Sequence, residues 1–134
     1  MVDARVARRI ALVGAGLMTI AAAAPARLTT TLWHVHLVKS DPAANDTLAT
    51  APKAVQLWFS EKVELPITRV KLADDAGAAV SLAPLARDAA ADAPVAAAIT
   101  KPLAAGSYVV TWSTAATDGH PAKGTFGFVV KATH

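Results

Sequence analysis

The chain has 134 residues, a formal net charge of +3 and no cysteine. This length allows one domain with a single modest core, and the lack of cysteine excludes disulfides and thiolate chemistry. The first ten residues contain three arginines and one aspartate, so most of the excess positive charge lies there. Since the rest of the chain has no basic patch, nucleic acid and anionic membranes are not expected partners.

The amino-terminal segment has the layout of a secretory signal peptide. Its arginines are followed by an uncharged apolar run at 10–24, which is shorter than the roughly twenty apolar residues that a spanning helix needs. We therefore predict that residues 1–26 are a cleaved leader and that the protein is exported. Cleavage just before Arg27 leaves 27–33 as a remnant or tail, and the alternative is a later cut, as late as Trp33.

Four segments with alternating apolar residues predict half-buried strands. They are AVQLWFSEKV, ITRVKLA, SYVVTWS and GTFGFVVK, separated by turn signals in SDPAAND, DDAG and LAAGS. The predicted inward residues are, in that order, Val55, Leu57 and Phe59; Val70 and Leu72; Tyr108, Val110 and Trp112; and Phe126, Phe128 and Val130.

The Ala-rich stretch LARDAAADAPVAAAI is ambiguous, because alanine favours a helix. Pro94 interrupts it, so we predict a loop with at most one helical turn and then a short strand at 95–100. The segments add up to about seven strands, spaced as in an immunoglobulin-like sandwich or a small Greek-key barrel. The predicted fold class is therefore all-β.

Two short pairs of side chains suggest a metal site. His34 and His36 are two residues apart, and side chains at this spacing on an extended backbone point the same way. Asp118 and His120 have the same spacing in TDGHP, where Gly119 adds backbone freedom. The first strand and the last inter-strand loop of a sandwich lie at one end, so we expect the pairs to converge.

The donor types narrow the choice of metal. Imidazole and carboxylate suit divalent Cu, Zn or Ni, and both methionines, Met1 and Met18, lie in the predicted leader. The mature domain therefore offers no sulfur ligand for Cu(I). Cu(II) fits nitrogen and oxygen donors best, although Zn(II) stays open on residue type alone.

Each motif also has a purely structural interpretation. An exposed histidine at a strand start needs no function, and an Asp-Gly dipeptide before Pro121 is a common turn. We expect Trp58 and Trp112 to be packing residues. We expect Glu61 and Glu64 to mark a solvated strand end.

Two long stretches closely resemble the CopC family of bacterial copper resistance proteins. HVHLVKSDPAANDTLATAPKAVQLWFSEKVE contains the H-x-H-L start, the Ser-x-Pro-Ala turn and the F-S-E-x-V-E strand of that family. PLAAGSYVVTWSTAATDGHPAKGTFGFVV contains its A-G-x-Y-x-V-x-W strand and the D-G-H-P motif. The resemblance covers nearly all of residues 34–134 and implies a cupredoxin-like or immunoglobulin-like Greek-key β-sandwich in the periplasm that binds Cu(II).

The resemblance also implies the ligands. By position they are His34, through its imidazole and its free amine, together with Asp118 and His120, while His36 is auxiliary. The methionine-rich loop by which some members bind Cu(I) has no counterpart in VKLADDAGAAVSL, which implies a member that binds only Cu(II). In the family the leader is cut directly before the first histidine. A cut before Arg27 would leave His34 without a free amine, and His36 would then be recruited instead.

The function predicted from the sequence is that of an exported Cu(II)-binding protein that is not an enzyme. It sequesters copper, or delivers it to a CopD-like transport protein in the inner membrane. One alternative is a histidine-brace copper oxidase or monooxygenase, because such enzymes also bind copper through an amino-terminal histidine. The other is a metal-free immunoglobulin-like module for adhesion or assembly.

Overall fold

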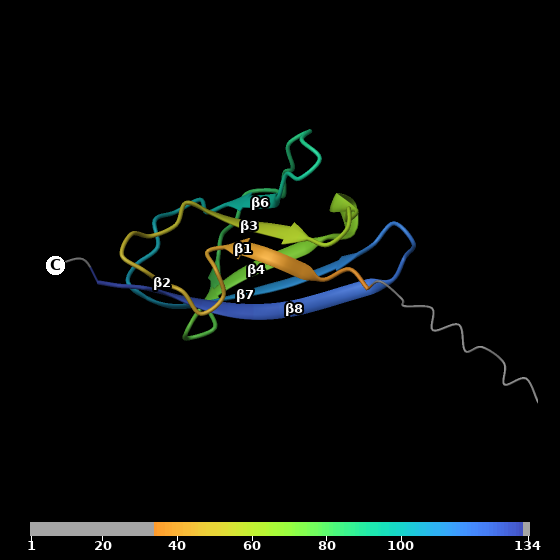
Figure 1. Ribbon diagram of the computed structural model, residues 1–134. Coiled ribbons are helices and arrows are strands. Elements are labelled where there is room, and N and C mark those ends of the chain that lie inside the picture. The colour runs from red at the N-terminus through yellow and green to blue at the C-terminus, as the bar shows by residue number, and fades with distance from the viewer. Residues whose placement is uncertain (1–33, 133–134) are drawn as a thin grey trace, which may run out of the picture. The chain divides into compact units, whose positions relative to one another are not determined.

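Two β-sheets form the framework of residues 34–132, the part of the chain that the computed structural model describes (Figure 1). The smaller sheet has the order β1-β3-β6, with β1 at Leu37–Asp41, β3 at Ala54–Phe59 and β6 at Val95–Ala98. Both of its pairings are antiparallel. The predicted leader at 1–26 and the segment 27–33 lie outside the described residues.

The larger sheet has the order β2-β8-β7-β4-β5. Its strands are β2 (Thr47–Leu48), β4 (Arg69–Asp74), β5 (Ala79–Val80), β7 (Gly106–Ala115) and β8 (Pro121–Val130). Among the described strands only β2 and β8 pair in parallel. A 3-10 turn, η1 (Leu65–Ile67), leads into β4 and is the one helical element in 34–132. No helix in that range is long and apolar enough to cross a membrane.

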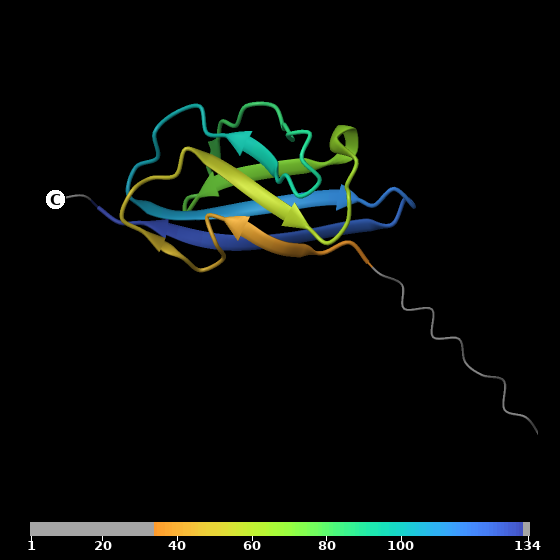
Figure 2. The same cartoon turned by 45° about the horizontal axis from the view of Figure 1, so that its top comes forward.

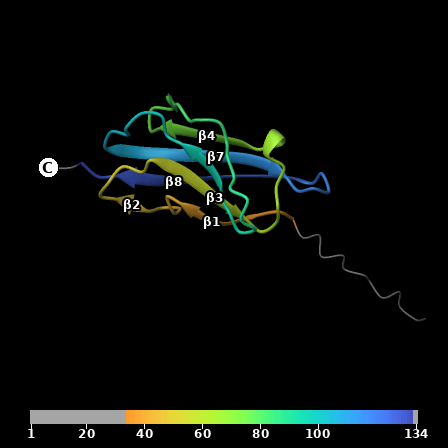
Figure 3. The ribbon, with the colours of Figure 1, turned by 90° about the horizontal axis from the view of Figure 1, so that it is seen from above.

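The two sheets lie one over the other as a β-sandwich. Seen from above, β3 crosses β7 and β8 obliquely (Figure 3). The ribbon shows the start of the described chain and the turn between β7 and β8 at the same end of the molecule (Figure 2). The connection from β1 to β3 passes through β2, which belongs to the other sheet. The predicted all-β sandwich is therefore confirmed.

The main core lies between the sheets and consists of the inward faces that the alternation predicted. Its buried members are Val55, Leu57, Leu72, Tyr108, Val110, Trp112, Phe128 and Val130. Phe59, Val70 and Phe126 are partly buried and pack against them. Each fully buried apolar side chain of this size stabilises the fold by about 1.5–3 kcal/mol. All four predicted strands and their buried faces are thus confirmed.

The Ala-rich stretch contains no helix, as expected from Pro94, and its strand is β6 at Val95–Ala98 instead of 95–100. The described residues contain eight strands, where about seven were expected for the whole domain. The two strands not anticipated, β2 and β5, have two residues each. Such short pairings leave no alternation in the sequence to detect.

A glycine in β8 lies directly against the buried indole of Trp112. A Cβ atom at Gly124 would stand 2.6 Å from Cζ2 of Trp112. Trp112 is 6% exposed, and its ring packs edge-on against Phe59 with 5.1 Å between centroids. The ring therefore has little room to move away.

We expect Gly124→Ala to lower the free energy of unfolding by about 1–3 kcal/mol, because the added methyl group overpacks the core. Denaturant unfolding followed by tryptophan fluorescence measures this change.

Gly127→Ala is the matched control, since it makes the same substitution in the same strand. Its Cβ would stand 3.3 Å from the Tyr108 carbonyl oxygen, which is a milder contact. The loss should be smaller than at Gly124. Equal losses at both sites would contradict this account of the packing around Trp112.

Candidate metal centre

Asp118 and His120 lie in the turn that connects β7 to β8. The Gly119 N–H donates to the Ala116 carbonyl at 2.9 Å, and the Ala116 N–H donates to the His120 carbonyl at 3.2 Å. Gly119 has a φ of 87°, in the left-handed region that favours glycine. The pair is thus brought together by a tight turn and not by the extended backbone that its two-residue spacing suggested.

The Asp118 carboxylate bonds His120 at two points. Its Oδ1 accepts the backbone N–H of His120 at 3.0 Å, and its Oδ2 lies 2.9 Å from Nδ1 of the imidazole. The His120 and Asp118 side chains are 50% and 55% exposed. With Nδ1 directed at the carboxylate, Nε2 is the ring nitrogen left for a ligand outside the turn.

These hydrogen bonds also lower the pKa of Asp118. The bond from the His120 backbone N–H is the largest cause, and the bond from the His120 side chain is the second. Both favour the ionised carboxylate. Asp118 therefore carries its negative charge throughout the neutral range.

His34 lies beside this turn. Its ring centroid is 6.0 Å from that of His120, and the ring planes meet at 80°. A ring nitrogen binds a metal at about 2.0 Å, so two imidazoles on one ion have centroids roughly 4.5–6.5 Å apart. The observed separation lies within that range.

The position of His34 follows from the burial of its neighbour. Val35 is 3% exposed and packs in a second small core with Val63, Val95 and Ala116. Val63 and Ala116 also form a β-bridge, and Ala116 begins the β7–β8 turn. Burying Val35 in this small core therefore holds the start of the described chain next to Asp118 and His120.

His36 is exposed, like His34, and the buried Val35 lies between them, so the two histidines share one face as expected. Its Nδ1 lies 3.3 Å from the carbonyl oxygen of His34. Its backbone N–H donates to the hydroxyl of Ser60 at 3.0 Å. The backbone of His36 thus links the start of β1 to the residue that follows β3. The His36 ring contacts only the backbone of its own segment in these bonds.

His34, Asp118 and His120 together offer two imidazoles and one carboxylate at one end of the sandwich. Residues 34–132 contain no group of three or more His, Cys, Asp or Glu side chains already arranged to hold a metal ion. The distance between the two rings fits a shared ion, but their orientation does not yet direct three donors at one point. Rotation of exposed side chains, which occurs in picoseconds to nanoseconds, would be needed to close the site.

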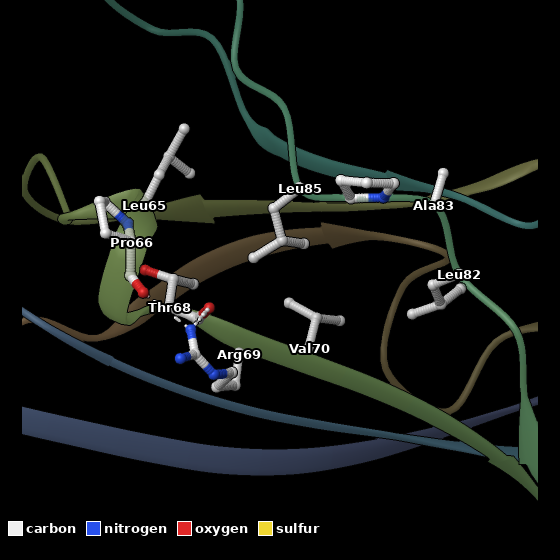
Figure 4. A pocket seen from close by; sticks show the side chains of 9 residues that line it. Leu65, Pro66, Thr68, Arg69, Val70, Leu82, Ala83 and Leu85 are labelled. Atoms are coloured by element: carbon white, nitrogen blue, oxygen red, sulfur yellow. Dashed lines mark hydrogen bonds between the residues drawn. The ribbon is translucent and has the colours of Figure 1, made fainter.

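The structure also shows the surface residues for which the sequence suggested a purely structural role. Glu61 and Glu64 are exposed, and Trp58 is half-buried under the Nζ of Lys39, 4.4 Å from the ring centroid. An open depression lies between η1 and the 82–85 segment (Figure 4). Its lining residues are Leu65, Pro66, Thr68, Arg69, Val70, Leu82, Ala83, Pro84 and Leu85. These include no histidine, carboxylate or aromatic side chain, so the depression adds nothing to the metal centre.

Comparison with known proteins assigns the family. The family model described as the CopC domain matches residues 37–131. The chain belongs to the CopC family. The matched region includes Asp118 and His120 and begins just after His36, so His34 precedes it.

The chain is also similar to individual curated proteins. Protein YobA of Escherichia coli K12 is 32% identical over 105 residues, which cover 78% of this chain and 85% of YobA. Copper resistance protein C of Pseudomonas syringae pv. tomato is 36% identical over 103 residues, covering 73% of this chain and 81% of that protein.

Two crystal structures share the fold. CopC from Methylosinus trichosporium OB3b superimposes with a TM-score of 0.67 at 30% identity, covering 75% of this chain and all of that one. PcoC, a methionine-rich copper resistance protein from Escherichia coli, gives 0.65 at 30% identity and covers 73% of this chain and 99% of its own.

Sequence reasoning missed two contributors to this region. Val35 carries a readable signal, because it alternates with two histidines and so had to face inward. Ser60 carries none, since its contact with His36 depends on how β3 ends.

The hydrogen bonds of Asp118 predict a titration that can be measured. In His120→Ala the imidazole is lost but the backbone N–H of residue 120 remains. We therefore expect the pKa of Asp118 to rise part of the way towards the usual aspartate value, as measured by carboxyl-carbon NMR. In the wild type the pair's contribution to stability is present at neutral pH and is lost below about pH 4, as the carboxylate protonates. An unchanged titration of Asp118 in the variant would contradict the bonding described here.

Proposed function

We propose that this CopC family member is an exported protein that binds one Cu(II) ion through His34, Asp118 and His120. The observation that carries the proposal is the placement of the His34 ring 6.0 Å from that of His120. Those two residues are more than eighty positions apart in the sequence, and the small core around Val35 brings them together.

The donor chemistry supports copper as the cargo. Two imidazoles and a carboxylate suit divalent ions of the later transition series, and affinity in that series peaks at Cu(II), above Zn(II). The predicted mature domain contains no methionine or cysteine, so it has no soft ligand for Cu(I). The copper resistance proteins among its relatives point to the same metal.

The exposure of the site suits transfer of the ion. The His120 and Asp118 side chains are about half exposed, so a partner can approach a bound ion without unfolding the turn. We propose that the protein sequesters Cu(II) in the periplasm or delivers it to a CopD-like transport protein of the inner membrane. In this proposal the protein is a carrier and not an enzyme.

The amino terminus decides one part of the coordination. If the leader is cut directly before His34, the free amine and the imidazole of that residue form a chelate ring on the ion. If the cut falls before Arg27, His34 has no free amine, and His36 is recruited as the additional donor. The intact mass of the exported protein distinguishes these two starting points.

The ligand assignment predicts large losses of affinity. We expect His120→Ala to weaken Cu(II) binding by about a hundredfold or more, because even residues that only orient a ligand typically contribute roughly 10–100-fold. Asp118→Asn should also weaken binding, since it removes the negative charge. Competition with a chelator of known affinity measures each loss, and circular dichroism should show an unchanged fold.

Asp75→Asn is the matched control for Asp118→Asn. Asp75 is exposed in the loop after β4, whose final residue pairs with Tyr108 near the other end of β7. It should bind copper like the wild type. Wild-type affinity in His120→Ala would refute the assignment, and equal losses in the two asparagine variants would indicate a general charge effect.

Copper binding should also depend on pH. Imidazole must be deprotonated to bind a metal, and histidine ordinarily protonates near pH 6.5. We therefore expect the affinity to fall as the solution becomes acidic, measured by the same competition assay in non-coordinating buffers. Affinity that stays constant between pH 7.5 and 5 would exclude histidine ligands.

A further inference from the structure

The ladder between β1 and β3 ends in an unusual way next to His34. Leu37 and Phe59 are the last residues paired within the two strands at this end. One position further, the Ser60 N–H donates to the His36 carbonyl at 2.9 Å. The reciprocal bond from the His36 N–H goes to the Ser60 hydroxyl, at 3.0 Å, and not to the Ser60 carbonyl.

An antiparallel pair of this kind normally exchanges two backbone bonds. The chain bends at Ser60 and Glu61 as it leaves the smaller sheet for the Val63 bridge to Ala116. At this bend the serine side chain supplies the acceptor that the backbone would supply in a continuing strand. The ladder is therefore extended by one residue pair after β3 itself has ended.

We propose that Ser60 is a positioning residue for the metal centre, acting through His34. Two contacts fix the segment that carries this histidine: the buried side chain of Val35 and the double hydrogen bond between His36 and Ser60. Together they set the backbone direction at His34 while its imidazole stays exposed. This inference rests on the proposed copper site.

Removing the hydroxyl should loosen the segment without unfolding the domain. His36 and Ser60 are both exposed, so water can bond the His36 N–H in Ser60→Ala. The fold therefore loses little, but His34 becomes less ordered and must be ordered again when the ion binds. We expect Cu(II) affinity to fall about fivefold, the equivalent of one typical net hydrogen bond.

Two further variants test whether the loss of copper affinity comes from the missing Ser60 hydroxyl or from a general disturbance of the fold. Ser60→Thr keeps a hydroxyl acceptor and should retain most of the affinity. Ser107→Ala removes an exposed hydroxyl near the far end of β7 and should leave binding unchanged. Thermal unfolding midpoints of all three variants should stay close to that of the wild type.

A double-mutant cycle provides the decisive test. If Ser60 acts through His34, then Ser60→Ala should weaken copper binding in the wild type but have almost no further effect in a His34→Ala background. A fivefold loss that persists in that background would overturn the proposal, since Ser60 would then act directly or through another residue. Wild-type affinity in Ser60→Ala would also overturn it.

The cycle distinguishes this inference from the proposed function. If the wild-type protein binds no Cu(II), the copper site itself is wrong and the positioning role fails with it. If the wild type binds Cu(II) and Ser60→Ala binds it equally well, only the positioning role fails.

Faster amide hydrogen exchange at His36 in metal-free Ser60→Ala is also expected, and unchanged exchange would show that the hydroxyl does not hold this segment.

Discussion

The burial of Val35 is the constraint on which the candidate metal centre depends. Its side chain packs with Val63, Val95 and Ala116 in a small core that is separate from the main one. Burying a valine stabilises the folded state by about 1.5–3 kcal/mol, whereas ordering one residue of backbone costs roughly 1–2 kcal/mol. One buried valine can therefore hold a short segment, but only a short one. His34 is its immediate neighbour and lies within that reach.

In this region the backbone is held in place by packing and hydrogen bonds, whereas the candidate ligand side chains are exposed. Gly119 and the hydrogen bonds of Asp118 fix the β7–β8 turn, and the small core fixes the segment before β1. The His120 imidazole and the Asp118 carboxylate project from this framework and are about half exposed, and His34 is exposed as well. A closed structural metal site would surround its ion with protein donors. An exposed set of three donors on a fixed backbone is better suited to an ion that is taken up and passed on.

Much of the fold could be predicted from the sequence, because side-chain direction in a strand follows a period of two. Val110, Trp112 and Phe128 were placed inward by this rule, and they form the core. The rule fails for β2 and β5, which are too short to alternate. It does not apply to Asp118 and His120, because that segment is not extended and their side chains meet through a turn with a positive φ at Gly119.

The candidate site was predictable in composition but not in its supporting contacts. The identities of the three candidate ligands came from the resemblance to the CopC family, and the structure places His34 and His120 side by side. The contact between the Asp118 carboxylate and Nδ1 of His120 depends on the geometry of the turn, which no sequence pattern predicts. The role of the Ser60 hydroxyl depends on where β3 stops, which is a property of three-dimensional packing.

The most direct test of the central claim is a crystal structure of the copper-loaded exported protein, with the ion located by anomalous scattering at the copper edge. We expect one Cu(II) ion at the β7–β8 end of the sandwich, bound by the His34 and His120 imidazoles and the Asp118 carboxylate. Copper bound elsewhere, or at the turn with His34 directed away from it, would contradict the account.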